Sequence, residues 1–285
     1  MSNFIVGTAN FGQEYGVANR GKSLSKNELN ELIKWSQENG MNHFDTAQTY
    51  GDAQKILGSF LDLSLKPDVD SKLDERSCRS REDILKMAED IKKSLGIEQI
   101  STLYVHSEVA LKSGSTVEIS AGLKEILELG IAKRVGISIY TKDAIFYCKK
   151  KIPEFSVFQV PENICDRRLI TSTTIQRLSD EGIIFNVRSI FLQGLLLNPT
   201  YLPLNLQSYS TKLQELTLFA KENSMSVLEL CVAYAKSIPW ATGIIVGAAS
   251  LDQLKEIHEV SSLLPEGWEN SIPILPEDVV DPRKW

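Results

Sequence analysis

The sequence has few cysteines and few histidines, and neither type is grouped. The cysteines are Cys78, Cys148, Cys165 and Cys231. They lie far apart and form no Cys-x-x-Cys pair, which indicates free thiols in a reducing compartment rather than a disulfide framework. The histidines are His43, His106 and His258. Their spacing fits no zinc site, so we predict no metal centre.

Long apolar runs and an excess of basic residues are also missing. Near the N-terminus the only apolar run is Phe4–Val6, far too short for a secretory signal or a membrane span. The 285 residues carry a formal net charge of −6, with acids and bases interspersed and no basic stripe that could neutralise phosphates. We therefore expect a cytoplasmic protein that binds neither membranes nor nucleic acid. The sequence does not indicate an oligomeric state.

What the chain does contain is a regular alternation of short apolar and longer amphipathic segments. Its composition, 42% hydrophobic and 24% charged, is that of an ordinary globular protein. The expected strands are Phe4–Val6, Asn42–Phe44, Val69–Leu73, Leu103–Val105, Val135–Ile137, Val157–Val160, Ile183–Val187 and Gly243–Val246. Helical periodicity follows each strand, and this pattern is typical of βα units on a parallel sheet.

Capping residues mark where the helices begin. Ser25 with Glu28, and Ser115 with Glu118, have the spacing of capping boxes, while Gly40 is expected to end the first helix. The expected helices span 26–39, 53–60, 81–95, 116–129, 143–150, 169–180, 208–222 and 227–237, with a last one after Ser250.

Eight strands is the number that closes a (β/α)8 barrel. We predict an α/β fold in which residues 1–285 form a single (β/α)8 TIM barrel domain with a C-terminal tail from about residue 265. An open, doubly wound sheet is the competing architecture, but no Gly-x-Gly-x-x-Gly follows any strand. The sequence leaves open whether the tail covers one mouth of the barrel or packs on its outside.

Four polar residues fall at or just beyond the carboxyl ends of neighbouring expected strands. Asp45 and Tyr50 belong to the stretch NHFDTAQTYG, Lys72 lies near the end of the third strand, and His106 ends the fourth. Catalytic groups of such barrels gather at this end, so we expect the four to share a pocket. Each residue also has a structural alternative: a turn cap, loop packing, a solvated charge and a core histidine.

Together the four residues suggest one kind of chemistry. A phenol such as Tyr50 titrates near pKa ~10, and the Lys72 ammonium would lower that pKa. Asp45 would keep Lys72 charged, because a buried lysine is costly without a partner. A neutral His106 can donate a hydrogen bond to an oxygen that gains negative charge. The set predicts Tyr50 as a proton donor to a carbonyl oxygen, with the hydride supplied by a cofactor.

These residues resemble the aldo-keto reductase family, and the resemblance extends over essentially the whole chain. FDTAQTYG, with Gly58 further on, is similar to the family's DTAxxYGxSExxLG motif. Asp45, Tyr50, Lys72 and His106 match its tetrad in identity, order and spacing. The segments VGISIY, FQVPENICDRR, RSIFLQGLL and IIVGAASLDQL resemble its loops after strands five to eight. The resemblance implies NADPH-dependent reduction of an aldehyde or ketone, with Tyr50 as the general acid.

The resemblance also implies which residues hold the cofactor across the C-terminal mouth. Ser138 and Gln159 match positions that bind the carboxamide, and the run from Arg188 to Gly194 would flank the nicotinamide and the pyrophosphate. The full cofactor-binding set is Thr8, Asp45, Ser138, Gln159, Arg188, Ser189, Phe191, Gln193, Gly194, Gly247, Ser250 and Gln253.

Several positions depart from the family pattern. Ile139 replaces an asparagine, and Arg188 replaces the aromatic residue that stacks on the nicotinamide. Gly247 and Gln253 stand where the family has the lysine and arginine that grip the 2′-phosphate, which leaves Ser250 and Lys255 there and makes NADH an alternative to NADPH.

Other functions stay open at this level. One is a regulatory barrel that binds nucleotide with little turnover, and another is a Schiff-base lyase with Lys72 as nucleophile. Polar residues on the expected substrate loops suggest a hydroxylated carbonyl compound such as a sugar. They are Asn10, Gln13, Gln48 and Arg188.

Overall fold

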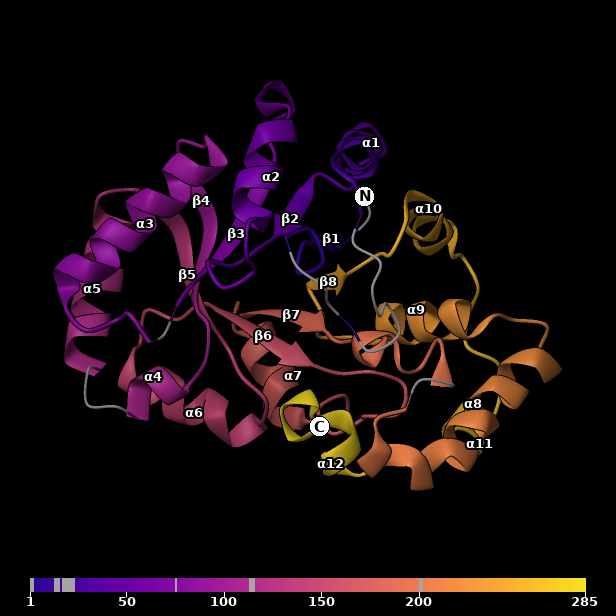
Figure 1. Ribbon diagram of the computed structural model, residues 1–285. Helices are drawn as coiled ribbons and strands as arrows, with labels where there is room; N and C mark the ends of the chain where they lie inside the picture. The colour runs from indigo at the N-terminus through magenta and orange to yellow at the C-terminus, as the bar shows by residue number, and fades with distance from the viewer. Residues whose placement is uncertain (1–2, 13–15, 17–23, 75, 113–115, 200–201) are drawn as a thin grey trace.

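The computed structural model describes residues 3–12, 16, 24–74, 76–112, 116–199 and 202–285. Its eight strands are β1 (Phe4–Gly7), β2 (His43–Asp45), β3 (Asp68–Leu73), β4 (Ile100–Val105), β5 (Ala132–Ser138), β6 (Val157–Pro161), β7 (Ile184–Arg188) and β8 (Gly243–Val246). They pair in chain order, all in parallel, and β8 closes on β1, as Figure 1 shows from one mouth. The predicted (β/α)8 barrel is confirmed.

Helices surround the barrel (Figure 1). They are α1 (Lys26–Glu38), α2 (Ala53–Phe60), α3 (Arg81–Leu95), α4 (Val109–Lys112), α5 (Thr116–Glu128), α6 (Lys142–Lys151), α7 (Thr173–Asp180), α8 (Ser210–Glu222), α9 (Val227–Ser237), α10 (Leu251–Glu259), α11 (Trp268–Ser271) and α12 (Glu277–Val280). Short 3-10 turns are η2 (Leu63–Leu65), η3 (Leu192–Gly194), η5 (Leu204–Tyr209) and η6 (Pro282–Lys284). Within the described ranges, none of the helices has the length and apolar character needed to cross a membrane.

One of the two predicted capping boxes is confirmed. Ser25 and Glu28 form the expected capping box at α1, whereas Ser115 lies outside the described residues. The start of α7 was predicted too early. It begins after the N-cap Ser172, whose hydroxyl accepts from the backbone of Ile175, while residues 169 and 170 precede the helix with their N–H groups bonded to the buried carboxylate of Glu162. Helix α4, in the loop after β4, was not anticipated.

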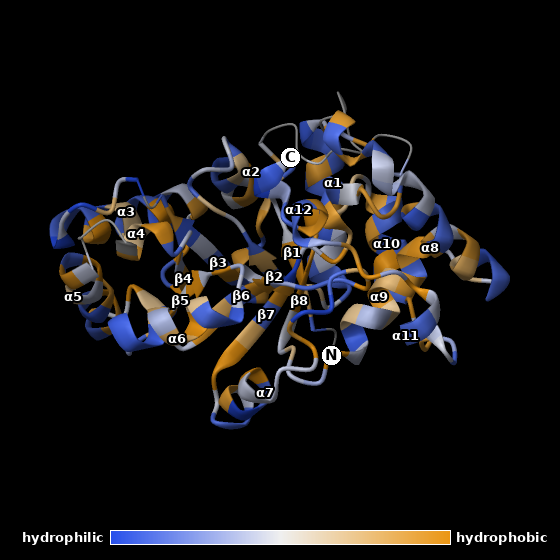
Figure 2. Ribbon diagram, turned by 90° about the horizontal axis from the view of Figure 1, so that it is seen from below, coloured by the Kyte–Doolittle hydropathy of each residue, from blue (hydrophilic) through white to orange (hydrophobic). Residues whose placement is uncertain are grey.

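Apolar side chains fill the layer between strands and helices. In Figure 2 the strands are largely coloured hydrophobic, and the surrounding helices have mixed faces. Gly58 of α2 shows how closely this layer is packed, since a Cβ there would lie 2.5 Å from the backbone oxygen of Ser94 in α3. Only glycine permits this approach of the two helices.

The tail after residue 265 passes the loop that follows β6 and ends at the C-terminal mouth. Arg167 donates to the backbone oxygens of Glu269 (2.9 Å) and Ile272 (2.7 Å). At the end of the tail, the guanidinium carbon of Arg283 lies 3.4 Å from the ring centroid of Tyr140, which follows β5. The tail therefore reaches the rim on which the functional residues of a barrel lie.

Candidate active site

A cavity of about 500 Å³ opens at the carboxyl ends of the strands. It is within the size range of ligand pockets. We call it the mouth pocket, and every strand or the loop after it contributes to its lining. The predicted site residues that line it are Thr8, Asp45, Tyr50, Lys72, His106, Ser138, Gln159, Arg188, Ser189, Phe191, Gln193, Gly194, Gly247 and Gln253.

Asp45 and Lys72 form a buried ion pair on the floor of this pocket. Lys72 Nζ lies 2.5 Å from Asp45 Oδ2, and the side chains are 2% and 5% exposed. Lys72 also donates to the backbone oxygen of Thr46 at 3.0 Å, and Gln159 donates its Nε2 to the other oxygen of Asp45. Both charges are thus paired and hydrogen-bonded, the condition under which a buried ion pair is tolerated.

Tyr50 stands beside this pair, on the turn between β2 and α2. Lys72 Nζ lies 5.1 Å from the centroid of the phenol ring. The ring of His106 makes an edge contact with it, with centroids 5.9 Å apart. Tyr50 lines the pocket, and among the described residues none accepts a hydrogen bond from its hydroxyl. A bound ligand can therefore receive its proton.

The sequence analysis expected Lys72 to lower the pKa of Tyr50, and the structure assigns that effect to another cation. Burial raises the pKa of Tyr50 above its usual value, Asp45 raises it further, and the cation that lowers it is Arg188 rather than Lys72. The reason is that Asp45, at 2.5 Å, balances the charge of Lys72. Tyr50 is accordingly a protonated phenol at neutral pH, a state suited to donating a proton.

His106 is neutral at physiological pH. Burial, reinforced by Lys72 and Arg188, lowers its pKa to about 4. The hydroxyl of Thr49 lies 3.1 Å from Nδ1. When that hydroxyl donates, the ring proton resides on Nε2, and this tautomer can donate a hydrogen bond to a ligand oxygen.

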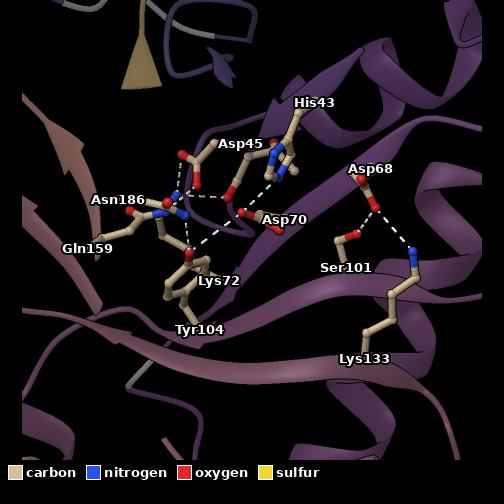
Figure 3. A network of polar contacts seen from close by, with 11 residues as sticks. His43, Asp45, Asp68, Asp70, Lys72, Ser101, Tyr104, Lys133, Gln159 and Asn186 are labelled. Atoms are coloured by element: carbon tan, nitrogen blue, oxygen red, sulfur yellow. Dashed lines mark hydrogen bonds and ion pairs between the residues drawn. The ribbon is translucent and has the colours of Figure 1, made fainter. Parts of the chain in front are cut away.

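Beneath the ion pair lies a second buried polar group that the sequence analysis missed (Figure 3). Asp70 is fully buried, 3.0 Å from His43 Nε2 and 3.5 Å from the hydroxyl of Tyr104, which also receives a bond from Asn186 at 3.0 Å. Burial acts to lower the pKa of His43, but Asp70 and its acidic neighbours outweigh that effect and the pKa is raised. The alternation of Asp68, Asp70 and Lys72 along β3 was the available signal, because alternate residues share one face of a strand.

Ser138 and Gln159 lie opposite each other on β5 and β6. With its nitrogen bound to Asp45, Gln159 keeps a buried Oε1 for which none of the described residues is a hydrogen-bond partner. Such an orphaned acceptor costs free energy unless a ligand supplies a donor. A carboxamide N–H is a donor of the required kind, so these two positions fit a nicotinamide.

The loop after β7 has an unusual backbone. Ser189, Leu192 and Gln193 have φ values of 64°, 48° and 54°, and Gly194 follows at 84°. Left-handed conformations of non-glycine residues cost roughly 1–3 kcal/mol each and gather at ligand sites. Successive residues of this kind can also turn backbone N–H groups toward an anion. This loop therefore fits the pyrophosphate of a dinucleotide.

The opposite end of the pocket differs from what the sequence suggested. Ser250 does not line it; its hydroxyl caps α10 by accepting from the backbone of Gln253 at 3.1 Å. The Gln253 side chain accepts from the backbone of Ala249 at 2.6 Å. Lys255 lies 3.9 Å from Asp252. In the described part of this end, no lysine or arginine lines the pocket.

Of the candidate substrate residues, two lie in the pocket. Arg188 and Asn10 line it, although the amide nitrogen of Asn10 is already bound to the backbone oxygen of Ala248 at 2.6 Å. Gln48 instead accepts from the backbone of Asp74 at 3.0 Å and does not line the pocket. Gln13 lies outside the described residues. Tyr140 lines the pocket but was missed, although it comes two residues after Ser138.

Comparisons with known proteins agree with this geometry. Residues 3–266 match the model of the aldo/keto reductase family. The chain is similar to aldo-keto reductase AKR2E4 of Bombyx mori, with 23% identity over 137 residues; the match spans 44% of this chain and 44% of that relative.

Two solved structures share the fold. An aldo-keto reductase of Bacillus halodurans, in its holo form, superposes with a TM-score of 0.74 at 18% identity and covers 94% of this chain and 90% of its own. A thermostable aldo-keto reductase in complex with the inhibitor epalrestat superposes with a TM-score of 0.72 at 18% identity. The match covers 95% of this chain and 93% of that one.

Proposed function

Because the chain belongs to the aldo/keto reductase family, we propose that it reduces an aldehyde or ketone to the alcohol with NADPH or NADH. The observation that carries the proposal is the arrangement around Tyr50. Tyr50 lines the mouth pocket together with the buried Asp45–Lys72 pair and a neutral His106.

In this proposal Tyr50 is the general acid and His106 orients the substrate. The Nε2 proton of His106 would donate a hydrogen bond to the carbonyl oxygen and polarise the C=O bond. Tyr50 would give its proton to that oxygen as negative charge develops there. The Arg188 guanidinium, which lowers the pKa of Tyr50, would stabilise the phenolate that remains, and Asp45 would hold Lys72 in place 5.1 Å from the phenol ring. The nicotinamide, when bound, supplies the hydride.

The cofactor would be held by residues spread across the mouth. The free Oε1 of Gln159, with Ser138, supports binding of the carboxamide. The left-handed loop after β7 supports binding of the pyrophosphate. At the far end, the absence of a cation among the described lining residues favours comparable use of NADPH and NADH. Hydrogen-bonding residues such as Asn10 support a hydroxylated, sugar-like carbonyl substrate.

The contacts of Lys72 disfavour the Schiff-base alternative. An amine acts as a nucleophile only when it is unprotonated. Here the Lys72 nitrogen donates hydrogen bonds to the Asp45 carboxylate and to the Thr46 oxygen, so it is held away from the role of an attacking amine.

The substitution Tyr50→Phe tests the proposal. It removes the proton donor and leaves the pocket otherwise intact, so we expect turnover to fall by a factor of about 100 or more. The dissociation constants of NADPH and NADH, measured by fluorescence titration, should change less than threefold. Tyr209→Phe, at a half-buried phenol before α8 and outside the residues that line the mouth pocket, is the matched control. Turnover by the Tyr50 variant within tenfold of the wild type would refute Tyr50 as the acid.

A further inference from the structure

Arg188 places a positive charge in the mouth pocket that no described acid balances. It ends β7, is half-buried and lines the pocket with Tyr50 and His106. Its charge reaches the reacting centre, because it lowers the pKa of both of these residues. Among the residues described by the structure, no carboxylate lies within 4.0 Å of its guanidinium.

Other cations near the mouth are paired. Lys72 is bound to Asp45 at 2.5 Å. Arg283 donates to both oxygens of Asp281, at 2.8 and 2.6 Å. Within the described part of the chain, Arg188 instead meets only neutral acceptors, the hydroxyl of Ser189 at 3.2 Å and the backbone oxygen of residue 139 at 3.3 Å. These two contacts use two of the five N–H donors of the guanidinium.

The position of this guanidinium is fixed before any ligand arrives. Its central carbon lies 4.4 Å from the ring centroid of Tyr140, and Arg283 of the tail contacts the same ring at 3.4 Å. The two hydrogen bonds hold its plane, and its buried Nε has no hydrogen-bond partner among the residues that the structure describes. A preorganised guanidinium with unused Nη hydrogens is well suited to a planar, bidentate anion.

We propose that Arg188 binds a carboxylate of the substrate, so that the preferred substrates are carbonyl compounds that carry a carboxylic acid. This inference rests on the proposed reductase function and specifies its substrate class. One unbalanced positive charge matches the single negative charge of a carboxylate. A phosphate monoester, with a charge of about −1.5 to −2 at pH 7, would remain partly unbalanced.

A matched pair of aldehydes tests this assignment. We would compare kcat/KM for 4-formylbenzoate and 4-formylbenzamide, which are similar in size and differ in charge. A charge-assisted hydrogen bond of this kind favours the acid by roughly ten- to a hundredfold. The wild type should show that ratio. Arg188→Met should reduce it to near one, and Arg188→Lys should retain an intermediate ratio because lysine is a point charge without the fork.

Arg283→Met is the matched control. Arg283 contacts the same tyrosine, but its charge is already balanced by Asp281 and its side chain is 46% exposed. The ratio should therefore stay within twofold of the wild-type value. A wild-type ratio near one, or a ratio that survives Arg188→Met, would overturn the proposal. So would a tenfold loss of NADPH and NADH affinity in Arg188→Met with the acid preference intact, which would assign Arg188 to the cofactor.

A binding measurement separates this inference from the reductase function itself. Calorimetric titration with benzoate and benzamide, performed on the protein saturated with oxidised cofactor so that the carboxamide site at Ser138 and Gln159 is already filled, requires no turnover. A preference for benzoate that disappears in Arg188→Met would support the carboxylate site even if neither aldehyde were reduced, in which case only the proposed reaction would fail. Equal binding of the two compounds by the wild type would overturn the carboxylate site while leaving reduction intact.

Discussion

Replacing Lys72 by methionine should destabilise the protein as well as inactivate it. Lysine and methionine side chains have similar length, so little packing is lost. Asp45, however, stays buried and keeps its hydrogen bond from Gln159 but loses the cation that balanced its charge. At 2.5 Å the attraction in the pair is about 7 kcal/mol with an effective dielectric constant of ~20. Much of this attraction offsets desolvation, and breaking a buried pair from one side typically costs about 3–5 kcal/mol. We expect a loss in this range in the free energy of unfolding.

The test is urea denaturation followed by circular dichroism, at pH 7, of four proteins. They are the wild type, Lys72→Met, Asp45→Asn and the double variant. The double variant carries no buried charge at this site, so it should recover about 2 kcal/mol or more of the stability lost in Lys72→Met. All three variants should lose most reductase activity. This would show that the stability and activity effects of the pair are separable.

An unfolding free energy of Lys72→Met within 1 kcal/mol of the wild type would refute this reasoning. It would mean that Asp45 becomes protonated at little cost or that water reaches it. A double variant no more stable than Lys72→Met would refute it in another way, because the loss would then come from packing rather than from the unpaired carboxylate.

Three further predictions concern cofactor choice and pH. Gly247→Lys with Gln253→Arg should lower the NADPH dissociation constant relative to that of NADH by at least tenfold; an unchanged ratio in fluorescence titrations would place the 2′-phosphate elsewhere. Because the pKa of His43 is raised in the folded protein, its pairing with Asp70 stabilises fully below about pH 6.5 and weakens as the pH rises through the raised pKa. Urea midpoints should therefore fall more between pH 6 and 8.5 in the wild type than in His43→Gln, and equal falls would contradict the pairing. Because the pKa of His106 is about 4, kcat/KM should show no acid limb from this residue between pH 5.5 and 7.5, and a limb in that range that disappears in His106→Gln would contradict the assignment.

The sequence by itself determined the fold and the identity of the central residues. Strand and helix periodicity reflects local hydrogen bonding and burial, which each segment reveals on its own, so eight βα units could be read in order. The carboxyl ends of parallel strands share one mouth, and this rule alone was enough to bring Asp45, Lys72 and His106 together. Helix α7 was misplaced because Ser172 is its N-cap, and residues 169 and 170 lie before the helix, bonded to Glu162 after β6.

Only the tertiary structure decided how these charges act on one another. Lys72 is balanced by Asp45, so Arg188 of β7 is the cation that lowers the pKa of Tyr50. The tail could have packed anywhere, yet it ends with Arg283 on Tyr140 at the rim of the pocket. Such effects depend on distances between residues far apart in the chain, and electrostatic energy follows distance and burial rather than sequence order.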